Sequence, residues 1–159
     1  MYQAFDMRLS AHFTLEEFTA SDTAARLGID NKLPDSLIDE ARKTAEMLEG
    51  IRYFLGMDSA KIIPLIVTSG YRCPTLNTMI GSSPGSDHPR MMAIDFKAPA
   101  FGTPLEVCRA LAPAVDVLKI GQLIYEFGSW IHVSTRIPDK IVNRVLTIDK
   151  RGTMAGIQG

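Results

Sequence analysis

A stripe of apolar residues at helical spacing dominates the first third of the chain. Between Pro34 and Gly56 such residues recur at intervals of three and four: Leu37, Ile38, Ala41, Ala45, Leu48, Ile51, Phe54 and Leu55. This spacing predicts an amphipathic helix of about five turns. A helix with one apolar face must bury that face against another layer. The next segment, residues 62–68, is rich in β-branched residues like a buried strand, so we expect the helix to pack on a sheet.

Two shorter helices are marked by capping boxes, in which a threonine and a glutamate three residues later satisfy each other's backbone N–H groups. Thr14 and Glu17 form one pair. Thr103 and Glu106 form the other, with Pro104 at the first helical position. We expect a helix to begin after each threonine. Further helical turns are expected over residues 21–28 and 74–79.

Runs of apolar and β-branched residues predict the strands of one sheet. These runs are residues 62–68, 93–96, 122–127, 130–135 and 141–148, the last of them an edge strand. Residues 151–159 are expected to be a frayed tail. Helices come first and strands with interspersed helices follow. The order predicts an α+β fold in a single domain over residues 1–159, with N-terminal helices packed on a mostly antiparallel sheet.

Composition narrows the classes of partner. The 159 residues, 46% hydrophobic, are enough for one core, and a net charge of −1 argues against a nucleic acid or an anionic membrane as the partner. No apolar run approaches the length of a membrane-spanning helix. The start of the chain lacks the pattern of a secretory signal peptide, so we expect synthesis in the cytoplasm without a leader. Cys73 and Cys108 are expected to be reduced thiols.

Two imidazoles and one carboxylate stand in the second half of the chain. His88 lies in a loop that leads into the strand carrying Asp95, and His132 lies in a later strand. A single histidine in such a place is more often a packed side chain than a ligand. Together the three side chains form a set that suits Zn²⁺ and can leave a fourth position open for water. Their spacing alone does not fix one geometry.

Three ordered motifs resemble a family of zinc peptidases. They are Val67-Thr68-Ser69-Gly70-Tyr71-Arg72, then Ser86-x-His88-x6-Asp95, then Trp130-x-His132-x-Ser134. This order resembles the zinc D-alanyl-D-alanine carboxypeptidases and L-alanyl-D-glutamate endopeptidases, called M15 peptidases. The family includes peptidoglycan-cleaving phage endolysins. Residues 9–18 also look like the lead-in of the endolysin-like subgroup, and the resemblance spans residues 9–135.

The resemblance implies a role for each matching residue. His88, Asp95 and His132 match the zinc ligands of the family, and Arg72 matches an arginine that binds substrate and polarises the scissile carbonyl. A guanidinium offers fixed donors to a developing oxyanion. The implied partners are the stem peptides of peptidoglycan.

The chain departs from the family pattern at two positions. Relatives commonly have glycine where this chain has Met91. A methionine at a position that needs a positive φ costs about 1–2 kcal/mol. Relatives also place the catalytic carboxylate three residues before the last histidine, where this chain has Ser129. A serine cannot act as the base.

Glu126, six residues before His132, is the nearest substitute for that carboxylate. Loop length decides whether it can serve. A two-residue turn at Gly128-Ser129 leaves Glu126 on the face opposite His132. A three-residue loop pairs Glu126 with Trp130 and points it toward the zinc side, where it could take a proton from water. An acid in an otherwise apolar strand favours a functional role over a structural salt bridge.

Two functions are consistent with these motifs. The first is a zinc peptidase that cuts either the D-Ala-D-Ala bond or the L-Ala-D-Glu bond of stem peptides. The second is a non-catalytic cell-wall-binding or structural phage component that retains the fold. Met91 and Ser129 favour the second, whereas the intact ligand set and Arg72 favour the first. A lysin released through a holin, a lysin carried in a virion and a cytoplasmic processing enzyme would all lack a leader.

Overall fold

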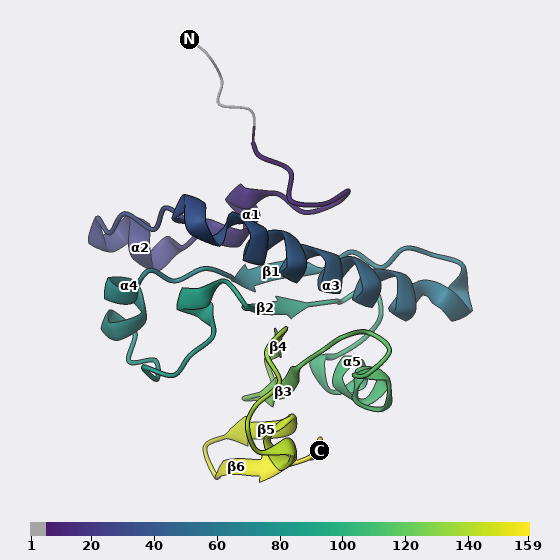
Figure 1. The fold of residues 1–159 in the computed structure, drawn as a ribbon. Coiled ribbons are helices and arrows are strands. Elements are labelled where there is room, and N and C mark those ends of the chain that lie inside the picture. The colour runs from purple at the N-terminus through teal and green to yellow at the C-terminus, as the bar shows by residue number, and fades with distance from the viewer. Residues whose placement is uncertain (1–5) are drawn as a thin grey trace.

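Helices cover one face of a six-stranded sheet in the computed structural model, which describes residues 6–159 (Figure 1). Residues 1–5, which include part of the start analysed for a signal peptide, lie outside the described residues. The helices are α1 (Leu15–Thr19), α2 (Asp22–Leu27), α3 (Ile38–Gly56), α4 (Pro74–Met79) and α5 (Pro104–Leu111). The strands are β1 (Ile66–Ser69), β2 (Ala93–Lys97), β3 (Gln122–Glu126), β4 (Trp130–Ser134), β5 (Val145–Asp149) and β6 (Gly152–Ala155). The expected α+β class is confirmed.

The helices begin where the local sequence signals placed them. Both capping boxes are present, at Thr14 with Glu17 and at Thr103 with Glu106. The long helix α3 spans 19 residues and buries the apolar stripe toward the sheet. Single turns of 3-10 helix complete the connections, at Asp35–Leu37, Met57–Ser59, His88–Arg90, Ala112–Ala114 and Ile141–Asn143.

The sheet runs in the order β1-β2-β4-β3-β5-β6. All neighbouring strands are antiparallel except β3 and β5, which are parallel, so the expected mostly antiparallel sheet is confirmed. β1 was expected to be a buried strand over residues 62–68 and is instead a short edge strand with Ile66 half exposed. Pro64 has no N–H to donate to a neighbouring strand, and pairing begins only after it.

The expected frayed tail is wrong for residues 152–155, because they form β6. The backbone of β6 pairs with β5, and the Gly156 N–H donates to the Val145 carbonyl at 2.8 Å. Thr147 extends the attachment, because its hydroxyl donates to the Gly156 carbonyl and accepts from the Gln158 N–H. β5 is therefore an inner strand and not the expected edge.

Alternation along the strands separates the core from an open face. On β3 and β4, Leu123, Ile131 and Val133 point into the core beneath α3 and α5. The intervening residues, such as Ile124 and His132, line a cavity on the other face. The sheet thus presents one apolar face to the helices, and its other face, which carries His132, borders the cavity.

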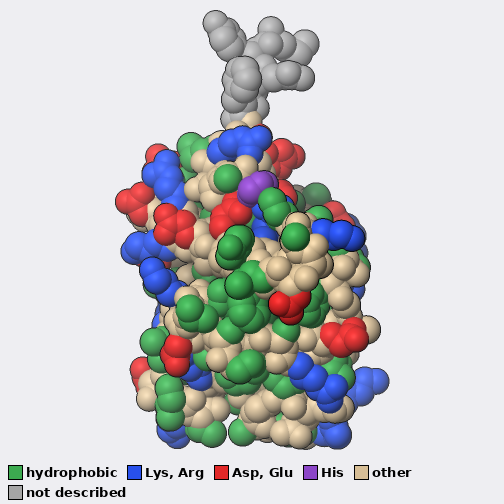
Figure 2. All heavy atoms as spheres, turned by 90° about the vertical axis from the view of Figure 1, so that its right-hand side faces the viewer, with side chains coloured by type: hydrophobic (Ala, Val, Ile, Leu, Met, Phe, Trp, Pro, Cys, Tyr) green, Lys and Arg blue, Asp and Glu red, His purple; other side chains and the backbone are tan. Residues whose placement is uncertain are grey.

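Apolar side chains are exposed on one outer face of the protein. Figure 2 shows hydrophobic side chains gathered near the centre of the face toward which the carboxyl-terminal end of α3 points. Tyr53, Met57 and Ile62 are exposed apolar residues at this end of α3 and in the loop that follows it.

Among residues 6–159, no helix is both long enough and apolar enough to cross a lipid bilayer.

Met91 ends the turn at His88–Arg90 in the left-handed conformation, with φ 58°. Its side chain is fully buried in the core, and its carbonyl accepts a hydrogen bond from the Thr44 hydroxyl at 2.7 Å. The positive φ costs about 1–2 kcal/mol, whereas truncating a buried methionine costs about 2–5 kcal/mol. Burial therefore outweighs the conformational cost of methionine at this position.

We predict that Met91→Ala and Met91→Gly are both less stable than the wild type. The glycine variant should be the more stable of the two by about 0.5–1 kcal/mol, because relief of the positive φ exceeds the entropic cost of glycine. Urea unfolding of both variants measures the difference. Ala45→Gly in α3 is the control and should show the usual loss of about 1 kcal/mol or more. A glycine variant less stable than the alanine variant would contradict the account.

Candidate metal centre

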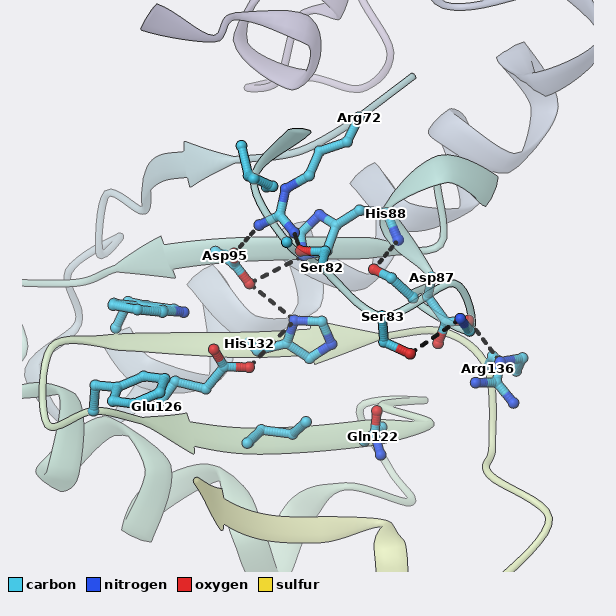
Figure 3. A pocket seen from close by; sticks show the side chains of 17 residues that line it. Arg72, Ser82, Ser83, Asp87, His88, Asp95, Gln122, Glu126, His132 and Arg136 are labelled. Carbon is cyan, nitrogen blue, oxygen red and sulfur yellow. Dashed lines mark hydrogen bonds and ion pairs between the residues drawn. The ribbon is translucent and has the colours of Figure 1, made fainter. Parts of the chain in front are cut away.

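Pairing of β2 with β4 brings the two strand-borne members of the His/Asp set together. Asp95 and His132 are directly opposite in the register, so their side chains share a face. The turn at His88–Arg90 contributes the third member, His88. The Asp95 Oδ1 atom lies 2.9 Å from His132 Nδ1 and 3.3 Å from His88 Nε2. One ligand atom from each residue lies within 4.8 Å of the others, and all three residues are buried (Figure 3).

The hydrogen bonds of His88 fix which nitrogen can bind a cation. His88 Nδ1 lies 2.6 Å from the Gly70 carbonyl, which can only accept, so Nδ1 carries the proton. In the neutral ring the Nε2 lone pair then faces the Asp95 carboxylate, and two acceptors 3.3 Å apart repel unless a cation lies between them. Burial lowers the pKa of His88 and disfavours a proton in that place. These groups therefore fit a metal ion such as Zn²⁺.

Asp95 and His132, the other two possible ligands, shift each other's pKa. Burial by itself raises the pKa of Asp95, but the neighbouring imidazoles of His88 and His132 hold it well below its usual range. Burial lowers the pKa of His132, yet its hydrogen bond to Asp95 and the carboxylate charge raise it overall. Asp95 is therefore ionised, as a metal ligand must be.

Arg72 completes the surroundings of Asp95. Its Nη2 donates to Asp95 Oδ2 at 2.9 Å, its Nε donates to the Ser69 hydroxyl, and its Nη1 donates to the Ser82 hydroxyl. The Arg72 guanidinium thus binds Asp95 Oδ2, and Asp95 Oδ1 remains for the two histidines. Arg72 also lines the open cavity, so a single guanidinium both holds Asp95 and borders the space for a ligand.

Glu126 lies on the same face because the hairpin has a three-residue loop. Glu126 pairs with Trp130, and Phe127 and Gly128 both take positive φ. Of the two loop lengths that the sequence left open, the structure has the one that points Glu126 toward the histidines. Its Oε1 lies 4.0 Å from His132 Nδ1, and burial raises the pKa of its carboxyl above the usual value. Ser129 is exposed at the turn.

These groups line a cavity of about 640 Å³. Figure 3 shows Asp95 between Arg72 and His132, with Glu126 at one end of the cavity and Arg136 at the other. A ligand in this space would meet the possible metal ligands, an acid with a raised pKa and guanidinium groups. Such a combination is typical of hydrolytic sites.

Comparison with known families assigns the chain. A protein-family model described as Peptidase M15 matches residues 11–134. The chain is an M15 peptidase family member. This agrees with the resemblance of the three sequence motifs, and members of the family are metal-dependent hydrolases. A search of curated proteins finds no match.

The Ser69-Gly70-Tyr71-Arg72 segment of this M15 member is held by the N-terminal helices. A Cβ on Gly70 would lie 2.3 Å from the Phe18 carbonyl oxygen, so only glycine permits this approach. The same carbonyl accepts the Tyr71 N–H at 2.6 Å. The end of α1 therefore sets the position of the carbonyl that orients His88.

Asn31 clamps the same segment, a role that sequence reasoning missed. Its amide group donates to the carbonyls of Thr19 and Tyr71, each at 2.9 Å, and its side-chain oxygen accepts the Cys73 N–H at 2.8 Å. An isolated asparagine between two helices gives no local signal for such long-range contacts. Ser82, which holds Arg72, was missed for the same reason.

Asp87, next to His88, is a buried link between the His88 turn and β4, a role that the sequence did not reveal. Its carboxylate accepts hydrogen bonds from the Ser134 hydroxyl at 2.7 Å and from Arg136 Nε at 2.6 Å. Since Ser134 follows His132 by two residues, this link joins the segments that carry the two histidines. The loop before His88 is capped by Ser86, because the Ser86 hydroxyl accepts the His88 N–H.

We predict that Asn31→Ala lowers the free energy of unfolding by about 1–3 kcal/mol, because it leaves two carbonyls and one N–H without their partner. Chemical denaturation followed by circular dichroism measures this. Asn143→Ala is the matched control, since Asn143 is exposed and its side chain is not among the hydrogen-bonded groups of the described residues. Equal stabilities of the two variants would show that Asn31 is not a clamp.

Proposed function

We propose that this M15 family member is a zinc-dependent peptidase that hydrolyses peptidoglycan stem peptides, as a D-Ala-D-Ala carboxypeptidase or an L-Ala-D-Glu endopeptidase. The proposal is carried by one observation. His88, Asp95 and His132 converge within a cavity that also contains Glu126, 4.0 Å from His132. The stem-peptide substrate is supported by the family and by the endolysin-like lead-in at residues 9–18.

The residues divide the chemistry between them. Zinc held by the three ligands would act as a Lewis acid, which lowers the pKa of water and polarises a carbonyl. Glu126 accepts the proton of the attacking water and returns it to the leaving amine, a task for which a raised pKa suits a carboxylate near neutral pH. Arg72 fixes Asp95, and because it also lines the cavity, its remaining Nη–H groups stabilise the developing negative charge.

Mass spectrometry of purified muropeptides incubated with the zinc-loaded protein tests the proposal. Loss of one D-Ala identifies the carboxypeptidase. Cleavage between L-Ala and D-Glu, which releases the peptide that begins with D-Glu, identifies the endopeptidase. Absence of any product, with zinc bound and the fold intact, would contradict the proposal. It would favour the non-catalytic cell-wall-binding or structural component that Met91 and Ser129 suggested.

We expect one zinc equivalent per chain in the wild type and less than about 0.1 in His132→Ala, because two ligands hold zinc far more weakly than three. Metal analysis after gel filtration in dilute chelator measures this. His12→Ala is the matched control, since His12 lies at the surface and binds Glu49. A full equivalent of zinc in His132→Ala would refute the ligand assignment.

We expect Glu126→Gln to lower turnover by about 10²–10⁴-fold while zinc stays near one equivalent, because glutamine keeps the size of the side chain but cannot accept the proton. The muropeptide assay gives the rate. Glu46→Gln, on the exposed face of α3, controls for the loss of a negative charge. If Glu126→Gln retains activity within about threefold of the wild type, another group is the base.

A further inference from the structure

A second arginine stands at the end of the cavity opposite Glu126. Arg136 follows β4, and its Nε is held by the buried carboxylate of Asp87 at 2.6 Å. Asp87 is also bound by the Ser134 hydroxyl, and its side chain is only 3% exposed, whereas that of Arg136 is 37% exposed. The arginine is therefore fixed at its base and accessible at its tip (Figure 3).

The two arginines of the cavity differ in what their donors meet. In Arg72 each of the three nitrogens donates to a serine or to Asp95. In Arg136 the side chain donates through Nε alone, and neither Nη atom has a hydrogen-bond partner among residues 6–159. A guanidinium held at Nε presents its two Nη groups as a parallel fork, the arrangement that binds a carboxylate through two hydrogen bonds.

The position of Arg136 fits an extended ligand. It lines both the main cavity and a neighbouring one of about 510 Å³, and Gln122 and Ile124 are the other residues that the two share. Arg136 lies four positions after His132 in the chain, so their Cα atoms are at most about 13 Å apart. A few residues of extended peptide cover that distance. An anion bound at Arg136 would thus belong to a residue close to the scissile bond.

We propose that Arg136, oriented by Asp87, is a substrate-binding residue that receives a free carboxylate of the stem peptide next to the bond that is cut. This rests on the proposed function and deepens it. Both candidate bonds have such a group on the leaving side. It is the terminal carboxylate of D-Ala in one case and the α-carboxylate of γ-linked D-Glu in the other. A fixed cation at this end of the cavity therefore suits either bond.

The test compares three forms of the pentapeptide L-Ala-γ-D-Glu-L-Lys-D-Ala-D-Ala with the zinc-loaded protein. One form has both carboxylates free, one has a C-terminal carboxamide, and one has the D-Glu α-carboxamide. The wild type should prefer the free acid over one of the two amides by about 10–100-fold in kcat/KM, the range of a charge-assisted hydrogen bond. The amide that is discriminated against also identifies the bond that is cut.

Arg136→Gln should abolish this preference, to within about threefold, mainly by raising KM for the free acid. Arg136→Lys should restore only part of it, because lysine lacks the fork. Arg90→Gln is the matched control. Arg90 also approaches Asp87, at 3.6 Å, but does not line the cavity, so its loss should leave the preference intact.

Failure of the inference is distinct from failure of the proposed function. If the wild type cleaves the peptide but treats acid and amides alike, or if the preference survives in Arg136→Gln, Arg136 is not the carboxylate-binding residue. If the wild type cleaves none of them, the peptidase proposal fails. The same comparison is then made by calorimetric binding of the three peptides, where equal affinities for acid and amides overturn the inference and a preference lost in Arg136→Gln supports it.

Discussion

One buried carboxylate organises the polar face of this protein. Asp95 sits on β2 between the edge strand β1 and β4, and its oxygens are contacted by Arg72, His88 and His132. Burying an unpaired charge costs several kcal/mol, so the folded state depends on these partners of Asp95. Arg72 compensates the negative charge from one side. The histidines therefore need not be charged to stabilise Asp95, and neutral histidines are the ones that bind metal.

Local signals predicted the helices well, and long-range pairing was where prediction failed. The capping boxes at Thr14 and Thr103 fix helix starts through contacts three residues apart, which a sequence displays directly. β6 and the parallel pairing of β3 with β5 depend on backbone groups that any residue provides, so nothing in residues 152–155 identifies their partner. Burial of β1 was misjudged for a similar reason, because a β-branched run fits an edge as well as the centre of a sheet.

The candidate site divides in the same way. Residue types and their order indicated His88, Asp95, His132, Arg72 and Glu126, and the structure brings these five side chains into one cavity. The groups that hold them were missed. Asn31 and Asp87 act on partners 40 or more residues away, through hydrogen bonds to carbonyls or to a serine and an arginine. A single sequence does not show such supports, because an asparagine or an aspartate in a loop is equally suited to a turn.

Both departures from the family pattern have a physical resolution within the described residues. Met91 takes the left-handed conformation that glycine takes most easily, and its buried side chain offsets the cost, so the turn that carries His88 still closes. Ser129 leaves the usual carboxylate position without an acid. The three-residue loop moves Glu126 onto the cavity face, so a carboxylate with a raised pKa still borders the histidines. Loop length, which a sequence specifies only weakly, thus decides whether an acid six residues from His132 lies on the same face of the sheet as that histidine.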